Sequence, residues 1–443
     1  MYPTANCLAV RVWAIGLGLI LLLHLLGVAR WRYDDGLWDN FENLDTRVIL
    51  RRLQQPHSVW AWFVGDWVLG NGFYRPLPSM LYQVDYWLWG DALLHWKWTN
   101  GLLATASALV LVGFVYTLTR RRSVALTVGL AFTLWQTGFA PPVPLWVGFG
   151  LLIAGVVWGY WQGDWRRGAV WGALAFALVV EWGFVGNLPD IHTKSFAYRA
   201  MGWIPGRTAT LMTLFALLAL WGAAGYARTG RARWAVLAVG GFVGAMLSYE
   251  QFLALPVLMA LVVWAVRPPR ALAIRAGAVC LACLLLLIPY AAFYRLHIPA
   301  HTQYHQQRIK RQKTLPMTAL DWLAPPAHEA WMQVDLACTA PFNLLFSRFW
   351  LAQVGLVAYL VALRYGLRLR YGWLGWLGSL LAYAPAAPLL PLMHYYYLPA
   401  VLRALWWGIL LLCLYTLRPT KKATSVAMVD ASYLKRSSQP STN

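Results

Sequence analysis

Residues 98–119 read WTNGLLATASALVLVGFVYTLT, and Arg120, Arg121 and Arg122 follow at once. A run of about 20 apolar residues is the length that an α-helix needs to cross a hydrocarbon core about 30 Å thick. The arginines that end it are typical of a loop on the cytoplasmic side of a membrane. This stretch therefore predicts a transmembrane helix and also the side on which it ends.

The same pattern recurs along the chain and predicts an all-α polytopic membrane protein. Of the 443 residues, 60% are hydrophobic and 12% are charged, and the mean hydropathy is +0.51. A soluble domain carries about 25% charged residues, so lipid must solvate much of this surface. We expect about twelve transmembrane helices, centred near residues 9–29, 98–119, 123–140, 143–161, 169–187, 207–226, 234–250, 252–266, 271–294, 349–363, 371–393 and 399–417.

Charged residues support this count, because the basic clusters fall in alternate predicted loops. The positive-inside rule places these loops and both termini in the cytoplasm, and we expect a multi-pass protein of a bacterial inner membrane. The net charge of +21 is spread over short loops rather than over a folded domain, which argues against nucleic-acid binding. The clusters are Arg120-Arg121-Arg122, Arg166-Arg167, Arg228/Arg231/Arg233, Arg267/Arg270, Arg364/Arg368/Arg370 and Arg418/Lys421/Lys422.

Residues 1–418 are predicted to form one transmembrane domain, and residues 419–443 a disordered cytoplasmic tail rich in Ser, Thr and Lys. Two extracytoplasmic loops, 30–97 and 295–348, are too long to be simple connectors. Long loops are usually functional or disordered, and the aromatic, proline and charged residues of these two favour function. The second contains a basic stretch, 301–313, that suits an anionic partner such as a lipid phosphate, and a plain solvated loop explains it equally well.

The first long loop begins with the acidic pair Asp34-Asp35, directly after the first predicted helix. Adjacent carboxylates at a membrane surface are costly unless water, a cation or a metal ion compensates their charge. One of them could act as a general base, or the pair could hold a divalent cation. A solvated start of an acidic loop explains the spacing equally well.

Other ionisable and aromatic residues are predicted to gather on the same face of the membrane. Arg75 lies between an aromatic residue and a proline, and its planar guanidinium suits a phosphate or the membrane interface. Ionisable groups at such positions are candidates for function. The remaining candidates are His192, Arg207, Glu250, Tyr396 and Tyr397.

These motifs, in this order, resemble those of membrane glycosyltransferases of the GT-C superfamily, and most closely the protein O-mannosyltransferase-like group that often carries tetratricopeptide repeats. The resemblance spans most of residues 30–417. The sequence departs from the family pattern at Ala104, Leu188 and Tyr249, and no tetratricopeptide domain follows the last predicted helix. The motifs are Asp34-Asp35, Tyr74-Arg75-Pro76-Leu77, Asn100, Trp203-Ile204-x-Gly206-Arg207 and Tyr396-Tyr397-Leu398-Pro399.

The resemblance implies a GT-C-like fold and a transferase that uses a sugar linked to polyprenyl or dolichyl phosphate. In that case Asp34 is the catalytic base, and Asp35 is its partner or a metal ligand. Arg75 and Arg207 hold the donor phosphate, and no cofactor other than a divalent cation is expected. His192 and Glu250 would line the pocket, with Tyr396 and Tyr397 near the donor headgroup. The acceptor hydroxyl (on a protein, lipid or glycan) and the stereochemical course stay open.

Two other classes fit part of the sequence. A transporter or lipid flippase would suit twelve spans, but it predicts internal pseudo-symmetry and helices broken near the midplane of the membrane. A non-catalytic membrane scaffold would tolerate the loss of Asp34 and Asp35. Because the polar residues gather at one face rather than in the middle, the sequence favours the transferase.

Overall fold

The computed structural model describes residues 3–32, 43–55, 58–70, 72–188, 195–297, 320–339, 348–387 and 393–417. Within these ranges the protein is helical and contains no strand. The predicted tail 419–443 and the basic stretch 301–313 lie outside the described residues.

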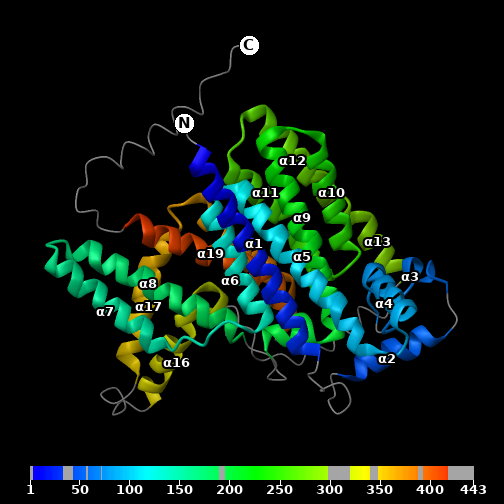
Figure 1. The fold of residues 1–443 in the computed structure, drawn as a ribbon, viewed down its shortest axis with the longest axis horizontal. Coiled ribbons are helices and arrows are strands. Elements are labelled where there is room, and N and C mark those ends of the chain that lie inside the picture. The colour runs from blue at the N-terminus through cyan, green and yellow to red at the C-terminus, as the bar shows by residue number, and fades with distance from the viewer. Residues whose placement is uncertain are drawn as a thin grey trace.

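Each of the twelve apolar segments contains a helix, and these helices form the main bundle (Figure 1). The ninth segment is divided in two at Leu286, where α12 ends and α13 begins. The helices are α1 (Pro3–Arg32), α5 (Leu93–Thr119), α6 (Arg122–Thr137), α7 (Leu145–Trp161), α8 (Trp165–Gly186), α9 (Arg207–Thr229), α10 (Ala232–Met246), α11 (Leu255–Val266), α12 (Arg270–Leu285), α13 (Leu287–His297), α17 (Phe349–Gly366), α18 (Arg370–Tyr383) and α19 (Tyr397–Thr416).

Seven helical segments among the described residues are long and apolar enough to cross a membrane. This is the composition of a multi-pass membrane protein. Several of the remaining helices are apolar but shorter, so twelve crossings stay a prediction. The seven are Val10–Trp31, Leu93–Thr119, Trp165–Gly186, Ile204–Thr229, Arg270–His297, Phe349–Gly366 and His394–Thr416.

The centre of the bundle is built on α9 and α19, which are the most enclosed of the long helices. Helix α9 packs against α5, α10 and α11, and α19 packs against α6, α8 and α18. Helices α1, α12 and α13 lie at the periphery and expose most of their apolar side chains. In a membrane those side chains would contact lipid.

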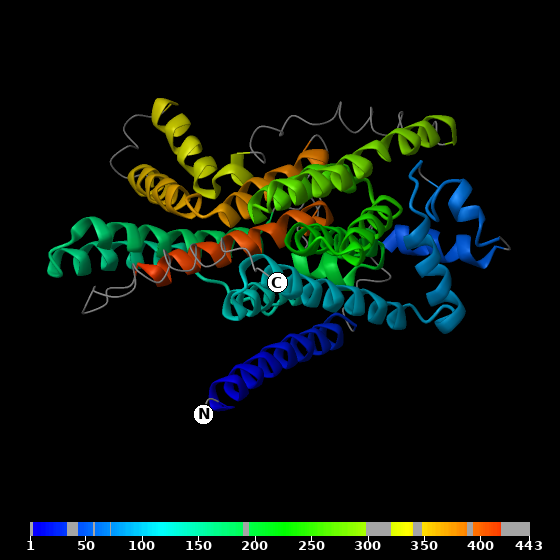
Figure 2. The ribbon, with the colours of Figure 1, turned by 90° about the horizontal axis from the view of Figure 1, so that it is seen from above.

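The first long loop contains a folded unit, which we call the α2–α4 module. It consists of α2 (Asn43–Gln54), α3 (Ala61–Val64) and α4 (Pro76–Trp89) and lies at one end of the bundle (Figure 2). A second apolar core holds it together. The side chains of this core are Ile49, Leu53, Trp62, Trp67, Val68, Phe73, Tyr82, Leu93, Trp96 and Ile204.

Short helical segments join several of the long helices. The segment after α8 includes a π-helix, η1 (Tyr198–Gly202), a geometry that occurs often at functional sites. The 3-10 turns are η2 (Ile204–Gly206), η3 (Glu250–Ala254), η5 (Ala384–Ala386) and η6 (Met393–Tyr396), and the second long loop contributes α16 (Pro325–Thr339).

Helices α7 and α8 form a hairpin whose backbones touch through glycines. A Cβ added to Gly155 would lie 2.6 Å from the Cα of Gly172. A Cβ added to Gly168 would lie 2.3 Å from the carbonyl oxygen of Gly155. Small residues allow this close approach, which maximises van der Waals contact between helices in lipid.

Candidate functional site

The structure describes five of the eight predicted site residues. Asp34 and Asp35, which follow α1, and His192, which follows α8, lie outside the described residues. The described five are Arg75, Arg207, Glu250, Tyr396 and Tyr397.

Arg75 and Glu250, 175 residues apart in the sequence, form an ion pair between the α2–α4 module and the bundle. The Arg75 Nη2 lies 2.7 Å from the Glu250 Oε2, and Nε lies 3.1 Å from both carboxylate oxygens. The side chains are 9% and 21% exposed. This bidentate geometry fixes the orientation of both groups.

Three aromatic rings enclose the Arg75 guanidinium. Its Cζ lies 4.1 Å from the ring centroid of Phe73, 4.4 Å from that of Tyr249 and 4.5 Å from that of Trp67. Burial by itself lowers the pKa of Arg75, but Glu250, Tyr249 and Tyr294 outweigh it and the pKa lies above the ordinary arginine value. Arg75 therefore remains a cation within a largely apolar cage.

Tyr294 and Asp66 complete the surroundings of this pair. The Tyr294 hydroxyl donates to the Glu250 Oε1 at 3.0 Å and accepts from the backbone N–H of Tyr74 at 2.8 Å. The Asp66 carboxylate accepts from the backbone N–H groups of Trp67, Gly72 and Phe73 at 2.7–2.9 Å. These bonds hold the turn that carries Arg75 against η3 and α13.

Arg207 forms a second ion pair, deeper in the protein. Its Nη2 lies 2.6 Å from the Asp85 Oδ2, its Nε donates to the Asn100 Oδ1 at 2.9 Å, and its side chain has no exposed surface. The guanidinium also lies over the ring of Tyr82. These contacts bind the start of α9 to α4 and α5. A role in holding phosphate stays a prediction for Arg207 and for Arg75.

Tyr396 and Tyr397 are both buried where η6 meets α19. The Tyr397 hydroxyl donates to the Gln136 side-chain oxygen of α6, and its ring stacks on Phe196. The Tyr396 ring packs against Trp322 and Tyr383. The side chains of the two tyrosines thus pack against different neighbours. A role near a donor headgroup stays a prediction for both.

The end of α1, from which Asp34 and Asp35 follow, packs against residues that the sequence analysis did not select. The Lys97 Nζ donates to the carbonyl oxygen of Trp31 at 2.7 Å. The Trp31 ring lies 6.0 Å from that of Tyr198 in η1. The next residue of that π-helix, Arg199, is 2% exposed, as is Lys97. Two buried cations therefore lie on the elements that hold the end of α1.

Aromatic contacts connect this region with the Arg75–Glu250 pair. The Arg199 guanidinium lies 4.6 Å from the ring of Trp203, and the ring of Trp203 lies 5.2 Å from that of His394. The His394 ring in turn lies 6.2 Å from that of Tyr249, one of the rings around Arg75. Loops of the bundle thus bring cations, rings and a carboxylate together at one end of the molecule.

A third ion pair lies within the long apolar helices. Glu181 of α8 and Arg403 of α19 have no exposed surface, and the Arg403 Nε lies 3.4 Å from the Glu181 Oε2. Tyr359 and Trp406 both donate to the Glu181 Oε1. Ionisable residues in apolar runs are functional candidates, so the runs VVEWG and VLRAL should have directed attention to both residues.

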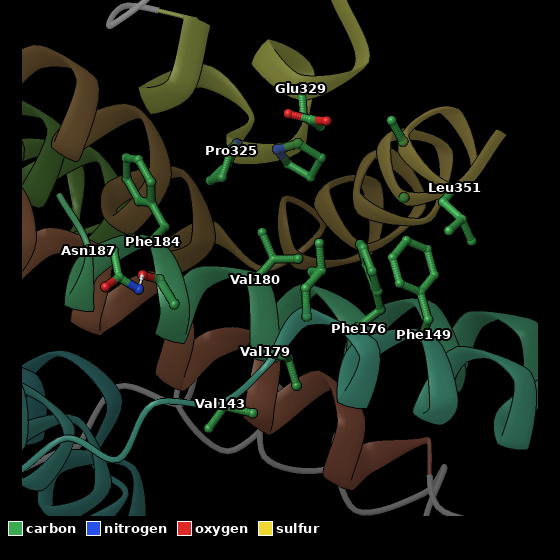
Figure 3. Close-up of a pocket in the computed structure, with 15 residues that line it drawn as sticks. Val143, Phe149, Phe176, Val179, Val180, Phe184, Asn187, Pro325, Glu329 and Leu351 are labelled. Carbon is green, nitrogen blue, oxygen red and sulfur yellow. Dashed lines mark hydrogen bonds between the residues drawn. The ribbon is translucent and has the colours of Figure 1, made fainter. Parts of the chain in front are cut away.

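A cavity of about 340 Å³ lies between α7, α8, α16 and α17 (Figure 3). Its walls are mainly apolar, with Phe149, Phe176 and Leu351 pointing into it, and Asn187 and Glu329 are polar residues at its edge. It shares no residue with the Arg75 or Arg207 pairs. An apolar chain fits this lining better than a sugar does.

No group of three or more His, Cys, Asp or Glu side chains within the described ranges could hold a metal ion. The predicted cation site at Asp34 and Asp35 lies outside those ranges. Comparison with known proteins adds no constraint, because no protein-family model, curated protein or solved structure matches the chain.

Proposed function

We propose that this chain is a GT-C-like membrane glycosyltransferase with twelve transmembrane helices and cytoplasmic termini. It would transfer a sugar from a polyprenyl-phosphate-linked donor to an acceptor hydroxyl on the extracytoplasmic side of a bacterial inner membrane. The observation that carries the proposal is the packing of the end of α1 against Lys97 and η1. Asp34 follows the last residue of α1 by two positions. The proposal puts the carboxylates of Asp34 and Asp35 beside the two buried cations, Lys97 and Arg199.

The carboxylates suit the deprotonation of the acceptor, and the cations suit the departure of the phosphate. The Asp34 carboxylate would take the proton of the acceptor hydroxyl while the oxygen of that hydroxyl bonds to the anomeric carbon of the sugar. The bond from that carbon to the donor phosphate breaks, and polyprenyl phosphate leaves. Lys97 and Arg199 would stabilise the charge that develops on the phosphate. Asp35 would orient Asp34 or bind a divalent cation with it.

The apolar cavity supports a lipid-linked donor. Its lining of Phe149, Phe176 and Leu351 suits an isoprenoid chain rather than a soluble nucleotide sugar. The segment with His192 begins shortly after Asn187, which lies at the edge of the cavity. If the lipid chain of the donor lies in the cavity, the phosphate of the donor would lie close to the loop that follows Asn187.

The test is transfer of radiolabelled sugar in membranes from a panel of polyprenyl-phosphate sugars. We expect wild type to transfer label from at least one donor, and Asp34→Asn to lose about 10²–10⁴-fold in rate because the base is absent. Lys97→Met should lower kcat by about 10²-fold, with Lys97→Arg recovering part of it. Arg52→Gln, which changes an exposed cation of α2, is the matched control and should keep full activity.

Each other result has a definite meaning. Equal transfer by wild type and Asp34→Asn, at equal expression, excludes Asp34 as the base. Activity that a strong chelator leaves unchanged excludes a metal ion at Asp34 and Asp35. No transfer by wild type from any donor would favour a transporter, a flippase or a scaffold, and lipid translocation in proteoliposomes would then separate these.

A further inference from the structure

Helix α3 presents two large apolar side chains away from the protein. Trp60, at its start, is 75% exposed and Val64 is 65% exposed, and both lie outside the candidate membrane spans. The tryptophan is the more informative of the two, because its ring combines an apolar body with a polar N–H. Such rings concentrate where membrane meets water.

A ladder of aromatic residues connects α3 to the end of α13. The Trp60 ring packs on Phe63 at 5.8 Å, and the backbone oxygen of Phe63 accepts from the Tyr74 hydroxyl at 3.1 Å. The Tyr74 ring lies 4.6 Å from that of Phe293 in α13. Both ribbon views place α3 beside the end of α13 (Figures 1 and 2).

Helix α13 belongs to a candidate membrane span, and the length of that span indicates how deep in the bilayer the contact between Tyr74 and Phe293 lies. Arg270–His297 has 28 residues, which at 1.5 Å per residue is about 42 Å of helix. The hydrocarbon core takes up about 30 Å, so about 12 Å of helix extends beyond it, shared between the two ends, and the last turn of α13 reaches the headgroup layer. Arg295 and His297 lie in that turn and Phe293 directly precedes it, and Ile288 and Leu296 are apolar and exposed on the same helix.

We propose that α3 is a membrane anchor, with Trp60 and Val64 in the headgroup layer of the bilayer beside the end of α13. The apolar surface of α3 continues the lipid-facing surface of α13, and Arg295 adds a cation at the depth of the lipid phosphates. The anchor would fix the α2–α4 module, and with it the turn of Arg75, at a set height above the membrane. The inference does not depend on the proposed enzymatic activity.

The test measures the depth of spin labels in nanodiscs. In a Cys7→Ser/Cys338→Ser parent the remaining thiols, Cys280, Cys283 and Cys413, are buried and supply the background. Labels at Trp60→Cys and Val64→Cys should be relaxed more strongly by oxygen, which partitions into lipid, than by a water-soluble nickel chelate. A label at Arg52→Cys, exposed on α2 of the same module, should show the opposite preference and is the matched control.

Two results would overturn the proposal. Equal exposure of the Trp60 and Arg52 labels to the nickel chelate would place α3 in water. Protection of the Trp60 label from both reagents would mean that protein, such as a second copy of the chain, covers α3. Elution of each labelled variant with the parent in size-exclusion chromatography shows that the fold is retained, so either result bears on α3 itself.

Discussion

Three buried arginines in the described part of the chain are each paired with a carboxylate. Arg75 pairs with Glu250, Arg207 with Asp85 and Arg403 with Glu181. Removal of one partner leaves an uncompensated charge in an apolar environment, whereas replacement of both by apolar side chains of similar volume is often neutral. The main effect of these ion pairs is therefore to determine which segments pack together. Their net contribution to the free energy of unfolding is small.

We expect Arg75→Met and Glu250→Met each to lower the free energy of unfolding by about 3 kcal/mol, because each leaves a partly buried charge without its partner. The double variant should recover at least half of the combined loss. Thermal unfolding in detergent measures all three against wild type. Losses that simply add in the double variant would show that the two side chains do not interact.

At this scale the sequence could indicate candidates but not their partners. Arg75 and Glu250 were selected because each is an ionisable group at a membrane surface. Their pairing depends on how η3 and the α2–α4 module fold together, and no local spacing encodes a contact over 175 residues. Lys97 was missed because it lies among the tryptophans at the start of α5, where a lysine usually only reaches toward the membrane interface.

At the scale of elements, apolar patterning predicted the long helices and missed the short ones. Every predicted apolar segment contains a helix, because a backbone in lipid must satisfy its own hydrogen bonds. Helices α2, α4 and α16 lie within predicted loops, and tertiary contacts rather than local apolar runs stabilise them. The turn between α3 and α4 is held by local hydrogen bonds instead, since the Asp66 carboxylate accepts from backbone N–H groups at most seven residues away.

Asp66→Ala should loosen that turn without unfolding the bundle. The carboxylate accepts three backbone hydrogen bonds, and bonds to a charged group contribute about 1.5–3 kcal/mol each. We expect faster amide exchange at Trp67, Gly72 and Phe73, with little change in α9 or α19. Asp91→Asn, on an exposed corner after α4, is the control. Unchanged exchange in the Asp66 variant would contradict the assigned role.

The glycines between α7 and α8 make a second prediction about elements. Gly155→Ala would force the two backbones apart, at an expected loss of about 1–3 kcal/mol. Gly150→Ala, on the same helix with nothing within 4 Å of its Cβ, should cause no loss. Thermal midpoints of the two variants in detergent provide the comparison. Equal midpoints would mean that the hairpin tolerates a wider spacing.

For the whole molecule, the main prediction concerns topology. If α10 and α11 both cross the membrane, the loops at Gly230 and Arg267 lie on the cytoplasmic side and Glu250 lies on the other. Cysteines placed at these three positions in the Cys7→Ser/Cys338→Ser parent can be labelled with a membrane-impermeant maleimide in intact cells. We expect labelling at residue 250 alone. Labelling at 230 or 267 would exclude the twelve-span arrangement with cytoplasmic termini. Patterning alone leaves this open, because helices of 12–15 residues are short for a full span.

The Glu181–Arg403 pair has a consequence for the synthesis of the protein. Glu181 is synthesised 225 residues before Trp406, which donates a hydrogen bond to it. Arg403, its ion-pair partner, is synthesised just before Trp406. At a translation rate of about 5–20 residues per second, α8 waits on the order of 10–45 s for α19. During that interval the Glu181 side chain lies in an apolar helix without Arg403, its ion-pair partner, and without the indole of Trp406. We therefore expect the hairpin of α7 and α8 to be held by the insertion machinery, or by its own glycine contact, until α19 is inserted.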